Sequence, residues 1–209
     1  GLPAKTPIEE SQPKQPINVY GRSKAMIEDI ITDFCLAYEM SAIYLRYFNA
    51  CGADDKGRTG ENHDPETHLI PSIIHTLLGK KEKFVIFGVD YNTPDGTCIR
   101  DYVHTADLAK AHVLATKYLT TKRATKGESQ AINLGTGQGY SVEEIIKTVE
   151  RITGKKVPVE HGPRRPGDPD RLVAGNHKAK KLLGWEPKSD LKTIIRTAWD
   201  WHSKYQNLL

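Results

Sequence analysis

The sequence predicts an α/β protein, and three observations lead to this class. Segments with strand character alternate with amphipathic helical segments along the chain, an order typical of sheets covered by helices. Capping residues and glycines mark where the helices begin and end. The chain has 209 residues, of which 38% are hydrophobic and 27% charged, so it can bury the core of one globular domain and an additional lobe.

Four elements are predicted in the first half of the chain. Residues 1–17 contain Pro3, Pro7, Pro13 and Pro16 and are expected to form an irregular lead-in. Apolar residues at helical spacing, or runs of branched and aromatic residues, predict the elements that follow. These are a helix over 23–38, a strand over 41–49, a helix over 68–80 and a strand over 83–87.

The second half of the chain continues the alternation. Thr105 or Asp107 is expected to serve the first turn of one helix, and Ser141 with Glu144 has the spacing of a capping box for the next. Gly184 is expected to end a later helix. The predicted elements are strands over 99–104, 130–134 and 157–160 and helices over 105–119, 142–152, 176–183 and 191–205.

Composition argues against several classes of protein. The net charge is +4, and no basic stripe is interleaved with stacking aromatics, so nucleic-acid binding is not predicted. The apolar runs are far shorter than the roughly 20 residues of a membrane span, and no secretory leader opens the chain. The three cysteines lack C-x-x-C spacing, so a cytoplasmic protein without disulfides is expected. The histidines, including His63, His68, His75, His104 and His112, show no metal-ligand spacing, so no metal site is predicted.

Tyr20 and Lys24 are the first candidates for chemistry. They are four residues apart at the start of a predicted helix, so their side chains lie on the same face. A cation close to a phenol favours the phenolate, and such a pair can transfer a proton. An ordinary amphipathic helix with a surface lysine has the same spacing, so the residues alone leave both interpretations open.

Two further segments carry candidate ligands for phosphate. Arg165 can bind a phosphate bidentately and Asp168 can accept hydrogen bonds from sugar hydroxyls, while Arg100 is a second candidate phosphate ligand. Structural salt bridges are the alternative. The glycines of Gly135–Gly139 follow a predicted strand but lack the G-x-G-x-x-G spacing, so a tight turn is favoured over a dinucleotide site.

Taken together, these motifs closely resemble the later part of the UDP-glucose 4-epimerases of the extended short-chain dehydrogenase/reductase family. The resemblance extends over almost the whole chain. The motifs that carry it are Asn18-Val19-Tyr20-Gly21-Arg22-Ser23-Lys24, Leu45-Arg46-Tyr47-Phe48-Asn49, His68-Leu69-Ile70-Pro71, Gly88-Val89-Asp90-Tyr91 with Asp95-Gly96-Thr97, Arg100-Asp101-Tyr102-Val103-His104 and Arg165-Pro166-Gly167-Asp168.

The resemblance implies an NAD-dependent isomerase of galactose metabolism that interconverts UDP-glucose and UDP-galactose. Tyr20 would be the acid/base on the sugar 4-hydroxyl, Lys24 would bind the nicotinamide ribose, and Phe48 would line the nicotinamide site. Hydride transfer from sugar carbon 4, rotation of the 4-keto sugar and hydride return complete the implied reaction. The residues implied to bind the UDP-sugar, besides Tyr20, are Asn49, His68, Leu69, Val85, Ile86, Phe87, Arg100, Arg165, Asp168 and Leu172.

The chain departs from the family pattern in two places. Some members have asparagine where His68 stands, whereas Leu172, four residues after Asp168, matches a family position that affects acceptance of N-acetylated sugars. In addition, the glycine-rich turn for the NAD pyrophosphate has no counterpart, so the chain is expected to be a carboxy-terminal portion that is inactive alone. The resemblance also implies a homodimer in the complete protein.

The implied fold is the carboxy-terminal part of a doubly wound Rossmann-type sheet with a smaller α/β lobe. Residues 1–50 and parts of 97–140 would belong to the NAD-binding domain, and residues 51–96 and 141–209 mostly to the UDP-sugar lobe. Two alternatives stay open. The chain could come from another nucleotide-sugar epimerase or dehydratase, or it could be a non-catalytic fragment that binds UDP-sugars.

Overall fold

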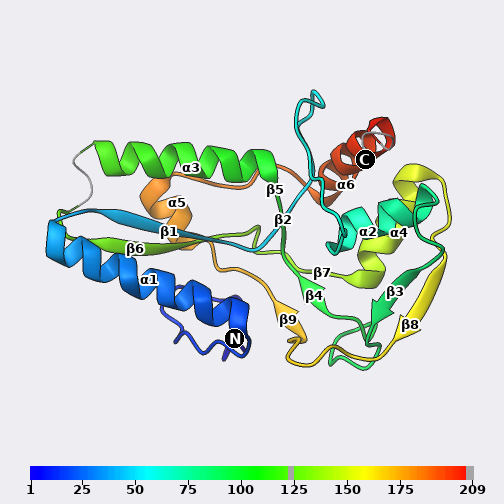
Figure 1. Ribbon diagram of the computed structural model, residues 1–209, viewed down its shortest axis with the longest axis horizontal. Helices are drawn as coiled ribbons and strands as arrows, with labels where there is room; N and C mark the ends of the chain where they lie inside the picture. Colours follow the sequence, from blue (N-terminus) through cyan, green and yellow to red (C-terminus); the bar gives the residue numbers. More distant parts are fainter. Residues whose placement is uncertain (122–124, 206–209) are drawn as a thin grey trace.

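Two long parallel strands form the centre of one part of the molecule. The computed structural model describes residues 1–121 and 125–205, and in it β1 (Ala42–Tyr47) pairs with β6 (Ser129–Leu134) (Figure 1). Alternate residues of a strand point to opposite faces. Ile43 and Leu45 therefore pack with α3 (Thr105–Thr120) and α5 (His177–Leu183), whereas Tyr44 and Arg46 contact α1 (Val19–Tyr38) on the other face.

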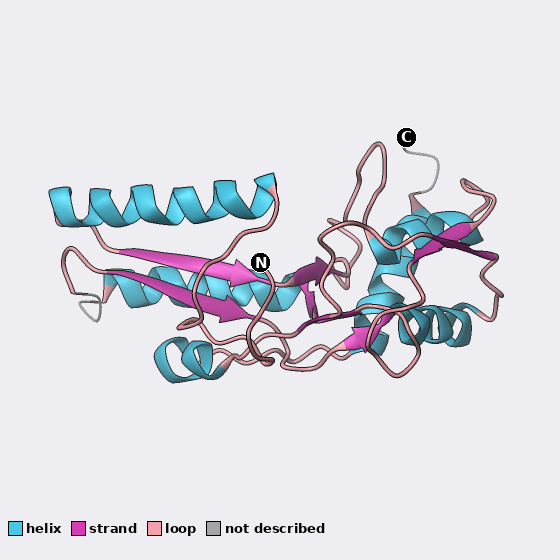
Figure 2. Cartoon of the chain, turned by 90° about the horizontal axis from the view of Figure 1, so that it is seen from below, coloured by secondary structure: helices cyan, strands magenta, loops and turns pink. Residues whose placement is uncertain are grey.

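The second part of the molecule is built around a shorter parallel pair. The strands β3 (Phe84–Phe87) and β8 (Val159–Gly162) lie beside three helices, α2 (Leu69–Leu77), α4 (Val142–Thr153) and α6 (Leu191–Lys204) (Figure 2). The apolar faces of these helices meet in one core. Its fully buried members include Ile73, Ile74, Ile145, Val149 and Ile195.

Short strands connect the two parts. β2 (Asn49–Cys51) pairs with β5 (Tyr102–His104), and β4 (Ile99–Arg100) lies between β7 (Tyr140–Ser141) and β9 (Arg171–Leu172). The prediction of single strands over 41–49 and 99–104 was wrong in this detail, because each segment divides into two strands with different partners.

Asp101 interrupts the second of these segments for a clear reason. Its buried carboxylate accepts hydrogen bonds from the backbone N–H groups of Thr136 (2.9 Å), Gly137 (3.0 Å) and Ala174 (3.2 Å). The Asp101 side chain therefore holds the glycine cluster after β6 in a tight turn, which is the conformation that the sequence predicts.

One helix start and one helix cap differ from the predictions. α1 begins one turn earlier than expected, because Asn18 Oδ1 accepts a hydrogen bond from Gly21 N at 2.7 Å. α3 begins at Thr105 as predicted and has Asp107 in its first turn, but the group that caps it is the Nδ1 atom of His104. The capping box of Ser141 and Glu144 at the start of α4 is confirmed.

The outer side of α1 is unusually apolar. Val19, Met26, Ile27, Ile30 and Phe34 are all about half exposed or more, and contiguous exposed apolar surface of this kind is typical of a contact face. Within residues 1–121 and 125–205, no helix is both long enough and apolar enough to cross a membrane.

Candidate functional site

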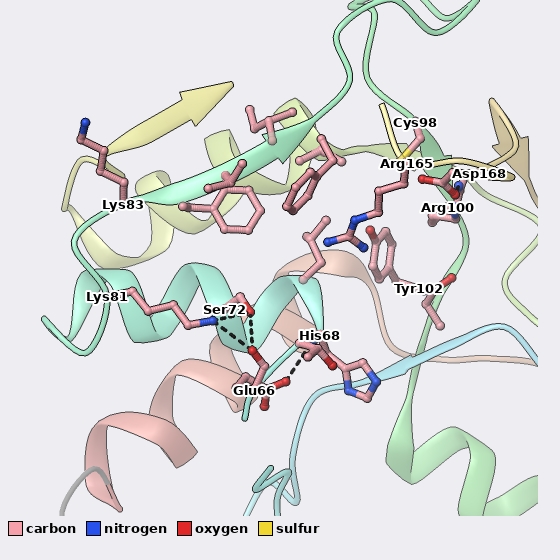
Figure 3. Close-up of a pocket in the computed structure, with 18 residues that line it drawn as sticks. Glu66, His68, Ser72, Lys81, Lys83, Cys98, Arg100, Tyr102, Arg165 and Asp168 are labelled. Carbon is pink, nitrogen blue, oxygen red and sulfur yellow. Dashed lines mark hydrogen bonds and ion pairs between the residues drawn. The ribbon is translucent and has the colours of Figure 1, made fainter. Parts of the chain in front are cut away.

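A cavity of about 490 Å³ opens in the second part of the molecule (Figure 3). Its volume lies within the range of small-molecule sites. The wall combines the first turns of α2, the strand β3, the segment from Cys98 to Tyr102 and the loop after β8. The lining residues are Asn49, Glu66, Thr67, His68, Leu69, Ser72, Lys81, Lys83, Phe84, Val85, Ile86, Phe87, Cys98, Arg100, Tyr102, Val142, Arg165 and Asp168.

Most of the residues that the sequence predicts for sugar-nucleotide binding converge on this cavity. They come from five segments that are far apart in the chain but meet around one space. The nine predicted residues that line it are Asn49, His68, Leu69, Val85, Ile86, Phe87, Arg100, Arg165 and Asp168.

Arg100 and Asp168 form an ion pair at one end of the cavity (Figure 3). Arg100 is buried and also donates to the Ile99 carbonyl at 2.7 Å. The other carboxylate oxygen of Asp168 accepts from the Tyr91 hydroxyl at 3.0 Å. Burial, together with the charge of Asp168, raises the pKa of Tyr91 to about 12, so this phenol remains a hydrogen-bond donor. The predicted phosphate ligand and the predicted ribose ligand are thus held in one network.

Arg165 and Arg164 are neighbours with different surroundings. The Arg165 guanidinium lies 4.1 Å from the centre of the Phe87 ring, at the cavity wall. Arg164 stacks on Tyr91 at 3.9 Å and pairs with Asp170, away from the cavity lining. Of the two, Arg165 is therefore placed to meet an anion in the cavity.

Two lysines add positive charge to the opposite part of the wall. Lys81 Nζ donates to the Glu66 carbonyl (3.0 Å) and to Ser72 Oγ (3.2 Å), which fixes this ammonium group at the start of α2 (Figure 3). Lys83 also lines the cavity. Four cationic side chains and two carboxylates belong to residues that line the cavity, a balance that favours an anionic ligand such as a diphosphate.

Two groups of the cavity lining, the Cys98 thiol and the Tyr102 hydroxyl, have pKa values that burial shifts away from neutrality. Burial raises the pKa of the Cys98 thiol, and it raises the pKa of the Tyr102 hydroxyl as well. Both groups therefore stay protonated at neutral pH. Cys98 and Tyr102 are therefore not activated for proton transfer.

Tyr20 and Lys24 lie on α1, and both side chains are exposed. Lys24 Nζ is 5.3 Å from the centre of the Tyr20 ring. Since α1 includes both residues, the predicted one-turn spacing on a single helix face is confirmed. Neither residue belongs to the described lining of the cavity.

Two other predicted residues also lie outside the lining. Phe48 follows the end of β1, where its N–H donates to the Leu134 carbonyl at 3.1 Å. Leu172 lies on β9, paired in register with Arg100. Because neither Phe48 nor Leu172 lines the cavity, their predicted roles stay predictions.

Sequence reasoning missed half of the cavity wall. Glu66, Ser72, Lys81, Cys98 and Tyr102 line it without belonging to a predicted ligand set. A usable signal was the apolar stretch of β3 flanked by Lys81 and Lys83, because a buried strand next to two lysines is suited to an anion site. The other residues are brought in by tertiary packing.

Comparisons with known proteins agree with this geometry. The family described as GDP-mannose 4,6 dehydratase matches residues 1–198. A UDP-glucose 4-epimerase of Rhizobium leguminosarum bv. trifolii is 49% identical over 98% of this chain and 61% of its own length. The chain therefore spans about three-fifths of the length of such relatives.

Two solved structures are similar in fold. UDP-glucose 4-epimerase of Brucella ovis in complex with NAD has a TM-score of 0.90 and 48% identity over 96% of this chain and 61% of that chain. UDP-glucose 4-epimerase of Stenotrophomonas maltophila, with bound NAD and formylated UDP-arabinopyranose, has a TM-score of 0.93 and 36% identity over 100% of this chain and 62% of that chain. The predicted Rossmann-type α/β class is confirmed. The chain belongs to the GDP-mannose 4,6 dehydratase family, and it is similar to UDP-glucose 4-epimerases over almost all of its length.

Proposed function

We propose that this chain is the substrate-binding portion, with part of the cofactor-binding portion, of an NAD-dependent UDP-glucose 4-epimerase. The observation that carries the proposal is the convergence of nine predicted UDP-sugar ligands on one cavity of about 490 Å³. The relatives named above, which carry this activity in their descriptions, support the same reading. We place the enzyme in galactose metabolism and in the cytoplasm.

The cavity suits the two chemical ends of a uridine diphosphate. Phe84, Val85 and Phe87 offer an apolar and aromatic surface for a base, and Asp168 offers a carboxylate for ribose hydroxyls. Arg165 and Arg100 supply guanidinium groups for the diphosphate. In this arrangement Arg100 exchanges part of its pairing with Asp168 for the phosphate oxygens.

The residues of the chain also fit the nicotinamide end of NAD. Tyr20 and Lys24 present a phenol and an ammonium group on one exposed helix face, and Phe48 lies at the end of the neighbouring strand. The glycine turn at 135–139 does not suit the pyrophosphate, because Asp101 already accepts its N–H groups. We infer that the pyrophosphate is held by residues outside this chain.

When bound, NAD supplies hydride acceptance from carbon 4 of the sugar and its return to the opposite face. Tyr20 takes the proton of the 4-hydroxyl and later gives it back. Lys24 binds the nicotinamide ribose and favours the phenolate of Tyr20 by its charge. Asn49, His68 and the arginines keep the UDP part in place while the sugar turns.

In this proposal, one part of the fold binds the cofactor and the other binds the sugar nucleotide. Residues 1–50 and parts of 97–140 form the remaining portion of the NAD-binding domain, and residues 51–96 and 141–209 form most of the sugar-nucleotide lobe. The exposed apolar side of α1 supports a homodimer of the complete protein through this helix.

Turnover by the complete protein tests the proposal. We expect interconversion of UDP-galactose and UDP-glucose with NAD bound. UDP binding without turnover would overturn the catalytic proposal and leave a non-catalytic UDP-sugar-binding protein.

A second candidate is an epimerase for a different UDP-sugar. The Stenotrophomonas maltophila protein, with its bound formylated UDP-arabinopyranose, favours testing this possibility. Parallel assays with UDP-N-acetylgalactosamine and a UDP-pentose distinguish the two, because the second candidate predicts a higher kcat/KM for one of these substrates than for UDP-galactose.

A further inference from the structure

The loop between β2 and α2 gathers four side chains that can bind a metal ion. Glu61, His63, Glu66 and His68 each offer one ligand atom, and these atoms all lie within 4.8 Å of one another. Linear spacing alone predicted no metal site. That prediction considered metal-ligand spacing on a common face with carboxylates, whereas in the structure the loop brings the four residues together.

Two of the distances between the ligand atoms are close to those around a four-coordinate ion. Metal–ligand bonds of about 2.1 Å in a tetrahedron place neighbouring ligand atoms about 3.4 Å apart. His63 Nδ1 lies 3.1 Å from Glu61 Oε1 and 3.6 Å from Glu66 Oε2. His68 Nδ1 contacts Glu61 Oε1 directly. A small outward movement of these groups would make room for an ion between them.

Glu66 supplies an independent reason to expect a cation. Its side chain is buried, with 2% of the side-chain surface exposed. One carboxylate oxygen, Oε1, accepts a hydrogen bond from His68 N at 2.7 Å. The other, Oε2, is buried without a hydrogen-bond partner among the residues the structure describes, and it faces His63. A buried carboxylate oxygen in this condition is costly unless a positive group meets it.

We propose that Glu61, His63, Glu66 and His68 bind one divalent transition-metal ion of the Zn²⁺ class. Two imidazoles with two carboxylates suit Zn²⁺, whereas Mg²⁺ and Ca²⁺ prefer sites made of oxygen atoms. Four protein ligands leave no open position in a tetrahedral site. The ion is therefore structural.

The position of the site indicates what the ion stabilises. The Glu61 carbonyl accepts a hydrogen bond from Trp201 Nε1 of α6 at 2.9 Å, and the loop lies beside this helix (Figure 1). Glu66, Thr67 and His68 form part of the cavity wall. The ion would join the loop to the wall at the start of α2. This proposal does not depend on the identity of the sugar nucleotide.

Metal binding to the complete protein tests the proposal. The protein is stripped with a chelator, dialysed, and titrated with Zn²⁺ by calorimetry, and its zinc content is measured after gel filtration. We expect one Zn²⁺ per chain. H63A and E66Q should weaken binding at least about tenfold, a loss consistent with the removal of a ligand. The matched control is H161A, because His161 is an exposed histidine on β8 outside the cluster, and it should retain the binding of the unchanged protein.

Cobalt gives a second readout that does not depend on activity. Bound Co²⁺ should produce the visible absorption of a four-coordinate site in the unchanged protein and in H161A, and this absorption should be lost in H63A. Circular dichroism checks that each variant is folded, and E66Q keeps the hydrogen-bonding shape of Glu66. Zinc binding that is well below one equivalent, or that is the same in H63A and E66Q as in H161A, would overturn the proposal.

Discussion

At the scale of single residues, the main feature is that the predicted acid/base Tyr20 lies outside the cavity that is lined by most of the predicted UDP-sugar ligands. The cavity is lined by arginines, lysines and aromatic rings, but its Cys98 thiol and Tyr102 hydroxyl remain protonated. Tyr20 is exposed on a different element, next to Lys24. Proton transfer by Tyr20 therefore predicts that its hydroxyl matters for turnover and not for the binding of UDP.

Tyr20→Phe in the complete protein should lower kcat about 100-fold to 10,000-fold, the usual contribution of a positioned acid/base. The affinity for UDP should stay the same. The matched control is Tyr38→Phe, the same change at an exposed position at the other end of α1. Steady-state kinetics with UDP-galactose and calorimetry with UDP provide the two measurements. Equal losses of kcat in the two variants would contradict the role of Tyr20.

Arg165→Ala should weaken UDP binding about 10-fold to 100-fold, because a charge-assisted hydrogen bond contributes roughly 1.5–3 kcal/mol. Arg164→Ala should leave the affinity nearly unchanged, since Arg164 pairs with Asp170 and stacks on Tyr91. The pair makes a close comparison, because the residues are adjacent in sequence. If Arg164→Ala had the larger effect on the dissociation constant, the assignment would be wrong.

At the scale of elements, the sequence predicted the longer helices and strands well. The apolar spacing of α4 and α6, the capping box at Ser141 and the glycine after α5 are local signals, and the structure confirms them. The two-residue strands β7 and β9 could not be predicted in this way. They exist because β4 lies between them, and this pairing joins residues more than 30 positions apart.

The site was less predictable than the fold. Arg100 and Arg165 were predicted as ligands because they belong to motifs with a family resemblance. Lys81 and Glu66 have no such motif, and they reach the cavity because the start of α2 packs beside β3. The His104 cap of α3 was missed because a histidine can accept a capping hydrogen bond only in one tautomer. That tautomer depends on the partner of the other ring nitrogen, which here is Thr197 on α6 at 3.1 Å.

The packing of α2 against α6 predicts a pH dependence of stability. The His75 and His202 rings meet edge to face with centres 5.1 Å apart. Burial, with the neighbouring His75, lowers the pKa of His202 from 6.5 to about 4. Between these pH values the unfolded chain binds a proton that the folded chain does not. The free energy of unfolding should therefore decrease as pH falls through this window, by up to about 1.4 kcal/mol per pH unit.

His202→Phe should make this dependence shallower, because the phenylalanine ring cannot bind the proton. Urea unfolding at several pH values between 4 and 7 measures the slope. His161→Phe, at an exposed position on β8, should keep the slope of the unchanged protein. The same slope in His202→Phe would show that the dependence comes from other groups.

At the scale of the whole molecule, the proposed function assigns to the chain most of a sugar-nucleotide site and part of a cofactor site. The N–H groups of Thr136 and Gly137 in its glycine turn already donate to Asp101, so this turn is not free to bind a pyrophosphate. The 209 residues should therefore bind UDP but not NAD in the micromolar range. Calorimetry with each ligand checks this expectation, with the complete protein as the positive control. Micromolar binding of NAD by the chain alone would contradict it.

The central claim is that the cavity between β3 and Arg165 holds the UDP part of a sugar nucleotide whose carbon 4 faces Tyr20. A crystal structure of the complete Tyr20→Phe protein with NAD and UDP-glucose tests it most directly. The account predicts the uracil beside Val85 and Phe87, the diphosphate on Arg165 and Arg100, and the sugar 4-hydroxyl next to residue 20. A nucleotide bound outside the cavity, or a sugar remote from residue 20, would contradict the account.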